Sequence, residues 1–199
     1  MGGDPATATA LVHAATSSGT DVRTLYLRVL QPALYEIGRR WEDAEISIAQ
    51  EHLATATTQS LMAQLAERLG ADTASRRGRT ALLACAEGEL HALGVRMVAD
   101  FLEADGWDVL FVGALSPVHS VVELAASQGV DLVALSAALR ERLPEVAAAV
   151  RALRELDQPP LIAVGGQAFA GDATTALATG ADVYADDGDA LVRELALRF

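Results

Sequence analysis

The sequence predicts a chain of two parts, a helical region followed by an α/β domain built on a five-stranded parallel sheet. Residues 5–70 show the apolar spacing of amphipathic helices throughout. From Thr80 onward, short apolar runs alternate with helical stretches, which is typical of a parallel sheet covered by helices. The polar segment between the two regions, residues 71–79, predicts a linker.

The helical region begins with a short helix, predicted over residues 6–19 and ending near Gly19. A second helix is predicted over residues 20–41, because apolar residues recur there with the spacing of one helix face: Leu25, Val29, Leu30, Leu34 and Ile37. Pro32 has no backbone donor, so we expect it to kink this helix or to restart it.

The third long helix is predicted over residues 47–70. Ser47 and Gln50 have the spacing of a capping box, in which each side chain binds the other residue's backbone N–H. Gly70 is well placed to end the helix. These signals predict a helical domain over residues 1–70.

The linker and the second domain follow directly. The linker, ADTASRRGR, consists of small and polar residues, and the α/β domain is predicted over residues 80–199. We expect the arginines of the linker only to interact with solvent: Arg76, Arg77 and Arg79.

The α/β domain contains five apolar runs that predict strands: TALLACA from Thr80, WDVLFVG from Trp107, DLVALSA from Asp131, PLIAVGG from Pro160 and ADVYADD from Ala181. Helical stretches separate them over residues 91–106, 120–129, 141–156 and 174–180. In such a domain, ligands bind outside the carboxyl ends of the strands. The loops that follow the strands are therefore the candidate ligand loops: residues 87–94, 113–119, 136–139 and 165–169.

Composition narrows the class of protein. The net charge is −12 and all 15 basic residues are arginines, so the chain lacks the basic surface of a protein that binds nucleic acid by itself. No apolar run approaches the length of a membrane span, and the N-terminal residues do not resemble a secretory signal. The single cysteine, Cys85, cannot form an internal disulfide and is expected to be buried. We therefore expect a cytoplasmic protein.

The loop after the first strand contains His91, with Glu89 two residues before it and Gly94 three residues after it. One ring nitrogen of a histidine at this place can bind a metal, while the other nitrogen donates to the nearby carboxylate. A histidine that caps the helix or lies on the surface is the alternative interpretation.

The third and fourth strands end in small residues. Ser136 closes the third strand, and Gly165 and Gly166 close the fourth, where they allow the backbone to approach a ligand closely. The first loop lacks the Gly-x-Gly-x-x-Gly pattern of a dinucleotide site. The combination instead indicates a deep channel for a flat ligand with a tail.

These motifs resemble those of the cobalamin-binding domain family: Glu89-x-His91-x-x-Gly94, Ser136 with Leu139, and Gly165-Gly166. The chain departs from the family pattern in two ways, with glutamate in place of aspartate at Glu89 and one extra residue before Leu139. The resemblance implies a Rossmann-like, flavodoxin-like sheet domain. It also implies that His91 replaces the dimethylbenzimidazole of the cofactor as the lower cobalt ligand, and that the displaced tail passes Ser136 and the glycine pair.

The resemblance extends to the helical region through Trp41, nine further residues, and then Glu51-His52. This spacing is similar to that of the light-sensing branch of the family, in which a four-helix bundle covers the upper face of the corrin. It implies that Trp41 packs over an adenosyl group, that Glu51 accepts hydrogen bonds from it, and that His52 lines the same pocket.

One position departs from the light-sensing branch. A histidine that binds cobalt after photolysis follows the tryptophan in that branch, whereas this chain has Glu42. His52 or water would then take the upper position. Two other histidines are weaker candidates: His119 for contact with the corrin edge, and His13 for a surface or packing role.

The function implied by the resemblance is a non-enzymatic photoreceptor that binds adenosylcobalamin. Its relatives carry a DNA-binding domain before the bundle, and this sequence contains none. The chain is then a fragment, or it signals through a protein partner such as a transcription regulator or through a homo-oligomer. No direct binding of nucleic acid or membrane is expected.

Three alternatives stay open. A corrinoid methyl carrier of a methyltransferase system would share the architecture, but a methyl group needs no polar acceptor such as Glu51. A mutase subunit would need a substrate barrel, for which the chain has no room. A light-independent cobalamin store or sensor is the third. Taken singly, Trp41 is also explained as a core aromatic, and Glu51 as a carboxylate that stabilises a helix N-terminus.

Overall fold

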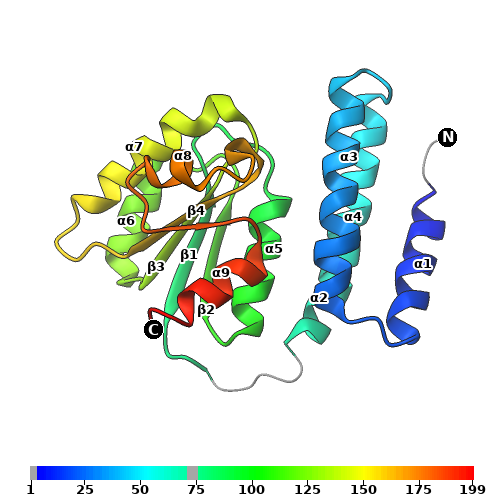
Figure 1. Ribbon diagram of the computed structural model, residues 1–199, viewed down its shortest axis with the longest axis horizontal. Helices are drawn as coiled ribbons and strands as arrows, with labels where there is room; N and C mark the ends of the chain where they lie inside the picture. The colour runs from blue at the N-terminus through cyan, green and yellow to red at the C-terminus, as the bar shows by residue number, and fades with distance from the viewer. Residues whose placement is uncertain (1–3, 71–75) are drawn as a thin grey trace. The chain divides into compact units, whose positions relative to one another are not determined.

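The computed structural model describes residues 4–70 and 76–199. The chain forms two compact units, residues 1–71 and residues 72–199 (Figure 1). The predicted linker falls partly outside the described residues, because residues 71–75 are not described. In the described ranges, no helix has both the length and the apolar character needed to cross a membrane.

The first unit is helical, as predicted. Its elements are α1 (Pro5–Ser17), α2 (Val22–Leu25), a π-helical turn η1 (Tyr26–Leu30), α3 (Gln31–Glu42) and α4 (Ile48–Leu69). Among residues 4–70, α2, η1 and α3 follow one another without a break and form one continuous helical segment. With α1 and α4, this unit therefore has three helical segments (Figure 1). The predicted capping box is present, with Ser47 and Gln50 each bound to the other's backbone N–H.

The π turn explains how the second helix passes Pro32. A π turn bonds residues five apart, and here the backbone N–H of Gln31 donates to the carbonyl of Tyr26. Val29, predicted on the apolar face, lies within this turn and is 44% exposed, whereas Tyr26 is fully buried. Leu34 and Ile37, predicted on the same face, are half-buried in α3. The Tyr26 hydroxyl donates to the carbonyl of Met62 at 3.0 Å, and this hydrogen bond connects the segment formed by α2, η1 and α3 to α4.

The second unit is a parallel sheet with helices on both faces, which confirms the predicted fold class. Its strands are β1 (Thr80–Cys85), β2 (Asp108–Gly113), β3 (Leu132–Ser136), β4 (Leu161–Gly165) and β5 (Val183–Ala185). All pairs are parallel, in the order β2-β1-β3-β4-β5. This is the flavodoxin-like order, in which the chain reverses direction across the sheet at β1 and β3.

Helices cover both faces of the sheet (Figure 1). Helices α5 (Leu93–Ala104) and α9 (Gly188–Leu195) pack on the face that carries Leu83 and Cys85 of β1. Helices α6 (Val118–Gln128), α7 (Leu143–Arg154) and α8 (Ala173–Leu177) pack on the face that carries Leu82 and Ala84. This alternation along β1 is the period of two expected of a strand buried on both sides. Helix α9 was not among the predicted helices.

The arginines before β1 do more than interact with solvent, so that prediction was wrong. The side chain of Arg77 pairs with Asp105 at 2.9 Å, and that of Arg79 pairs with Asp131 at 3.1 Å. The Arg79 guanidinium also lies over the ring of Phe199, 4.1 Å from its centre. These contacts fix the start of β1 to the amino-terminal edge of the sheet, which sequence spacing could not reveal because the partners lie 28 to 120 residues away.

Candidate functional site

The candidate loops meet at the carboxyl edge of the sheet, as parallel strands require. Ser136 lies in register with Cys85 on one side and with Gly165 on the other. The backbone N–H of Ala86 donates to the carbonyl of Ser136 at 2.9 Å, and the N–H of Ala137 donates to Gly165 at 3.1 Å. The loops after β1, β3 and β4 therefore form one hydrogen-bonded surface.

Glu89 is the residue that joins the loops after β1 and β3. Its side chain is only 1% exposed. One carboxylate oxygen, Oε1, accepts from the backbone N–H groups of Leu90 and His91 at 2.9 and 3.0 Å. The other oxygen, Oε2, accepts from the N–H groups of Ala138 and Leu139 at 2.9 and 3.2 Å. A buried carboxylate is tolerated here because the backbone of both loops satisfies it.

The imidazole of His91 makes the side-chain contact that the sequence predicted, with its Nδ1 against Oε1 of Glu89. Burial alone would raise the pKa of Glu89, but the hydrogen bonds from the ring and backbone of His91 and from Ala138 lower it to about 2. Glu89 is then an anion at neutral pH and can only accept. Nδ1 therefore donates in this contact, so Nε2 is the ring nitrogen through which a metal would bind. The ring is 51% exposed.

Cys85 lies beneath this loop, at the end of β1. Its Sγ is 3.8 Å from the carbonyl oxygen of His91, and the residue is buried, as predicted. Burial raises the pKa of the Cys85 thiol to about 12, and the charge of Glu89 acts in the same direction. The thiol stays protonated and packs as a small apolar group.

The predicted glycines differ in what requires them. A Cβ at Gly165 would lie 2.6 Å from the carbonyl oxygen of Ala185, and one at Gly166 would lie 2.3 Å from that of Ala137. Close packing of the protein's own backbone is therefore sufficient to require this pair, independently of any ligand. At Gly94 no atom beyond its chain neighbours and the nearby backbone of its own helix lies within 4 Å of the Cβ position, so packing does not require a glycine there.

The loop after β2 also reaches Glu89. The backbone N–H of Leu115 donates to the carbonyl oxygen of Glu89 at 3.2 Å, and that of Val118 donates to the Glu87 carboxylate at 3.3 Å. His119, the histidine expected here, lies exposed in the first turn of α6. Leu115 was not among the predicted site residues, because no motif marks it.

The three remaining site candidates belong to the helical unit. Trp41 lies near the end of α3 and is 43% exposed. Glu51 lies in the first turn of α4, where its carboxylate accepts from the Thr55 hydroxyl at 2.7 Å. The Nε2 of His52 is 3.6 Å from the other Glu51 oxygen, and its side chain is 71% exposed. The structure thus places Glu51 and His52 side by side within this unit.

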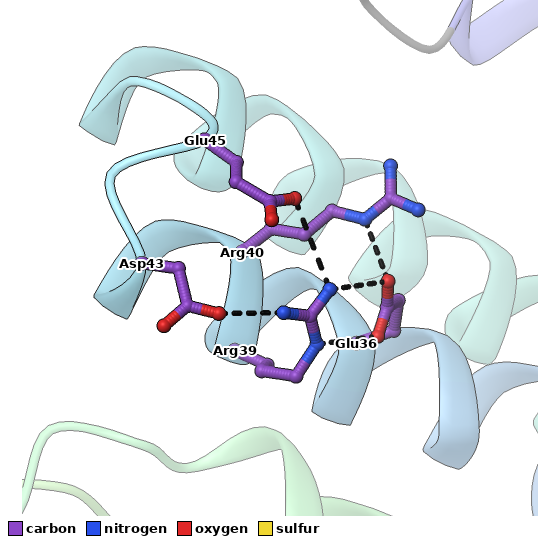
Figure 2. A network of polar contacts seen from close by, with 5 residues as sticks. All are labelled: Glu36, Arg39, Arg40, Asp43 and Glu45. Atoms are coloured by element: carbon purple, nitrogen blue, oxygen red, sulfur yellow. Dashed lines mark hydrogen bonds and ion pairs between the residues drawn. The ribbon is translucent and has the colours of Figure 1, made fainter.

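Charged residues form a network at the end of α3, the helix that contains Trp41 (Figure 2). The Arg39 guanidinium contacts Glu36 at 3.0 Å, Asp43 at 2.5 Å and Glu45 at 3.8 Å. Arg40 contacts the same Glu36 at 2.7 Å. Hydrogen bonds from the two arginines lower the pKa of Glu36 to about 2. These side chains are about half exposed, so solvent screens the network and it stabilises the helix end only weakly.

The sequence matches families of known proteins in both units. Residues 79–196 match the family described as B12 binding domain, and residues 1–66 match a second family with the same description. The monomethylamine corrinoid protein of Methanosarcina barkeri has the same fold, with a TM-score of 0.82 over 96% of this chain and 89% of that chain at 23% identity.

Two relatives have names that state different functions. The HTH-type transcriptional repressor CarA of Myxococcus xanthus is 33% identical over 165 residues, and this chain spans 54% of its length. Dimethylamine corrinoid protein 3 of Methanosarcina mazei is 26% identical over 161 residues, and this chain spans 94% of it. These matches, together with the Glu89–His91 pair at the carboxyl edge of the sheet, show that the chain belongs to the B12 binding domain family and is a cobalamin-binding module.

Proposed function

We propose that this chain is a non-enzymatic photoreceptor module that binds adenosylcobalamin with His91 as the lower cobalt ligand. The observation that carries the proposal is the contact between Nδ1 of His91 and the buried Glu89, because it holds the imidazole in the way that a carboxylate orients a metal-binding histidine. Gly94, three residues after His91, has nothing from elsewhere in the protein within 4 Å of its Cβ position, which is compatible with a ligand close to the start of α5. Ser136, Leu139 and the Gly165-Gly166 pair would line the path of the nucleotide tail.

The helical unit would supply the upper side of the site. We propose that Trp41 packs over the adenosyl group, that Glu51 accepts its hydrogen bonds and that His52 lines the pocket. When bound, the cofactor supplies a cobalt–carbon bond that light cleaves. The exposure of Trp41 and His52 supports the proposal, because side chains that take part in the protein's own core are not available for a ligand.

The signal would pass from the helical unit to another protein. Loss of the adenosyl group would remove contacts from Trp41 and Glu51 and would shift the packing of their helices. We propose that a transcription regulator or a second copy of the chain reads this shift in the cytoplasm. The similarity to a transcriptional repressor supports this reading, although this chain spans about half the length of that repressor.

The test is a pair of absorption spectra of the purified chain with adenosylcobalamin, in the dark and after green light. We expect binding in the dark and a lasting spectral change after light, with a change in apparent size on a gel-filtration column. His91→Ala should shift the dark spectrum, because the lower ligand changes. Spectra and size that are insensitive to light would contradict the photoreceptor role.

A second candidate function is a corrinoid methyl carrier. It is favoured by the match to the dimethylamine corrinoid protein, which extends over nearly the whole of that protein, unlike the match to the repressor. In this case, the chain should prefer methylcobalamin to adenosylcobalamin, and Trp41→Ala should leave the affinity for methylcobalamin unchanged. A Trp41→Ala variant that loses affinity only for adenosylcobalamin would support the photoreceptor instead.

A further inference from the structure

Leu115 has an unusual combination of conformation and exposure. Its φ is +58°, in the left-handed region that an L-residue other than glycine, asparagine or aspartate rarely adopts. Its side chain is nonetheless large and apolar, and the residue is 61% exposed. A leucine at this position contributes little to the stability of the fold, because its backbone is strained and its side chain is exposed to water.

The place of Leu115 connects it to the cobalamin site. Its backbone N–H donates to the carbonyl oxygen of Glu89 at 3.2 Å, and the carboxylate of the same Glu89 holds the His91 ring. Leu90, which lies between Glu89 and His91 in the chain, is also exposed, at 66%. Two exposed leucines from two different loops therefore lie next to the residue that orients the lower ligand.

Strain in the backbone persists where the surrounding structure imposes it, and it is concentrated at functional sites. Here the bond to Glu89 fixes the backbone of Leu115. Of the residues that the structure describes, two others besides glycines have positive φ, Ala44 and Ala170, and both have small side chains. Leu115 is thus the described residue at which this conformation is combined with a large apolar group.

We propose that Leu115, together with Leu90, forms an apolar contact for the corrin ring and contributes to its affinity. A corrin is a broad macrocycle that carries methyl groups as well as amide side chains, so leucines beside the imidazole ligand can pack against its apolar parts. Burial of an exposed leucine against such a ring is favourable. The inference rests on the proposed binding of cobalamin through His91 and extends it to a loop that carries no family motif.

The test uses Leu115→Asn in the full chain, because asparagine tolerates a left-handed conformation and removes the apolar group. We expect the ligand-free variant to melt about 3 °C higher than the wild type. Its Kd for hydroxocobalamin, measured in the dark by absorbance titration, should rise about tenfold. The melting temperature and the affinity should thus change in opposite directions. Substitution of a residue that only supports the fold would lower both of them.

Two further variants serve as controls. Leu115→Met keeps an apolar side chain and should bind within about threefold of the wild type. Leu197→Asn removes another exposed leucine, 83% exposed and two residues from the Phe199 that contacts Arg79 at the opposite edge, and should leave Kd unchanged. Unchanged affinity in Leu115→Asn, or a lower melting temperature, would overturn the inference. If the wild type itself binds no cobalamin, both the proposed function and this inference fail.

Discussion

Glu89 at the edge of the sheet and Glu36 on α3 have the same lowered pKa, about 2, for different reasons. Glu89 is buried and is held mainly by backbone groups of two loops. Glu36 is 45% exposed and is held by two flexible arginines of its own helix. The comparison shows that a lowered pKa measures how strongly the surroundings favour the charged form of the carboxyl group. How much that carboxylate stabilises the fold depends on its burial.

The same contrast separates the candidate residues of the two units. In the second unit, main-chain hydrogen bonds fix Glu89, and Glu89 fixes His91. Trp41 and His52 on the helical unit are largely exposed. In the proposed function, the fixed histidine would retain the cofactor, and the exposed side chains would rearrange when the cofactor changes.

The largest effect is expected from Glu89→Ala. The substitution leaves the N–H groups of Ala138 and Leu139 without their acceptor and frees the His91 ring, so unit 2 should lose about 3–5 kcal/mol of unfolding free energy. Urea unfolding followed by circular dichroism measures it. Glu87→Ala, two residues earlier and exposed, is the matched control and should cost far less. Equal losses would mean that burial does not distinguish the two positions.

The glycines should separate into those required by the fold and the one available to a ligand. Gly165→Ala should destabilise unit 2 by about 1–3 kcal/mol, because its Cβ would meet the Ala185 backbone. Gly94→Ala should stabilise the ligand-free protein by about 0.5 kcal/mol, because alanine favours a helix, and should weaken cobalamin binding. Unfolding curves and a cobalamin titration test both. Unimpaired binding by Gly94→Ala would contradict a ligand close to the start of α5.

Acid should reveal the contribution of Glu89. Its pKa is about 2 in the folded chain and near 4.5 when unfolded, so the unfolded state binds more protons between these values. The stabilisation is complete above pH 4.5, declines as the pH falls, and is lost below pH 2. Urea unfolding across this range should show a shallower dependence on pH in Glu89→Gln than in the wild type. Parallel profiles would show that other groups dominate acid unfolding.

The smallest effect is expected from Glu36→Gln. Although the pKa of Glu36 is lowered as much as that of Glu89, its partners are exposed and solvated, so the melting temperature of the chain should change little. The small change that occurs should vanish in about 1 M salt, which screens exposed charges. A loss comparable to that of Glu89→Gln would show that the network in Figure 2 stabilises the helix end strongly.

Much of the fold could be predicted from the sequence, because its signals are local. The apolar runs of the five strands, the capping box at Ser47 and the polar segment before Thr80 each depend on neighbouring residues, and the first two are found where expected. The contact between Glu89 and His91 was predictable for the same reason, since two residues separate them. The exposure of Val29 was not, because this residue lies in a π turn over residues 26–30, which α-helical spacing does not describe.

The sequence by itself determined the alternation of five strands with helices and the place of the His91 loop at the carboxyl edge, because hydrophobic periodicity and parallel topology leave few alternatives. Only the tertiary structure decided which groups satisfy Glu89, why Gly165 and Gly166 must be glycines, and that Leu115 lies beside the same site. These features depend on backbone atoms of residues 20 to 50 positions apart. The packing of strands and loops brings residues so far apart in the sequence into contact, and no local sequence pattern encodes that packing.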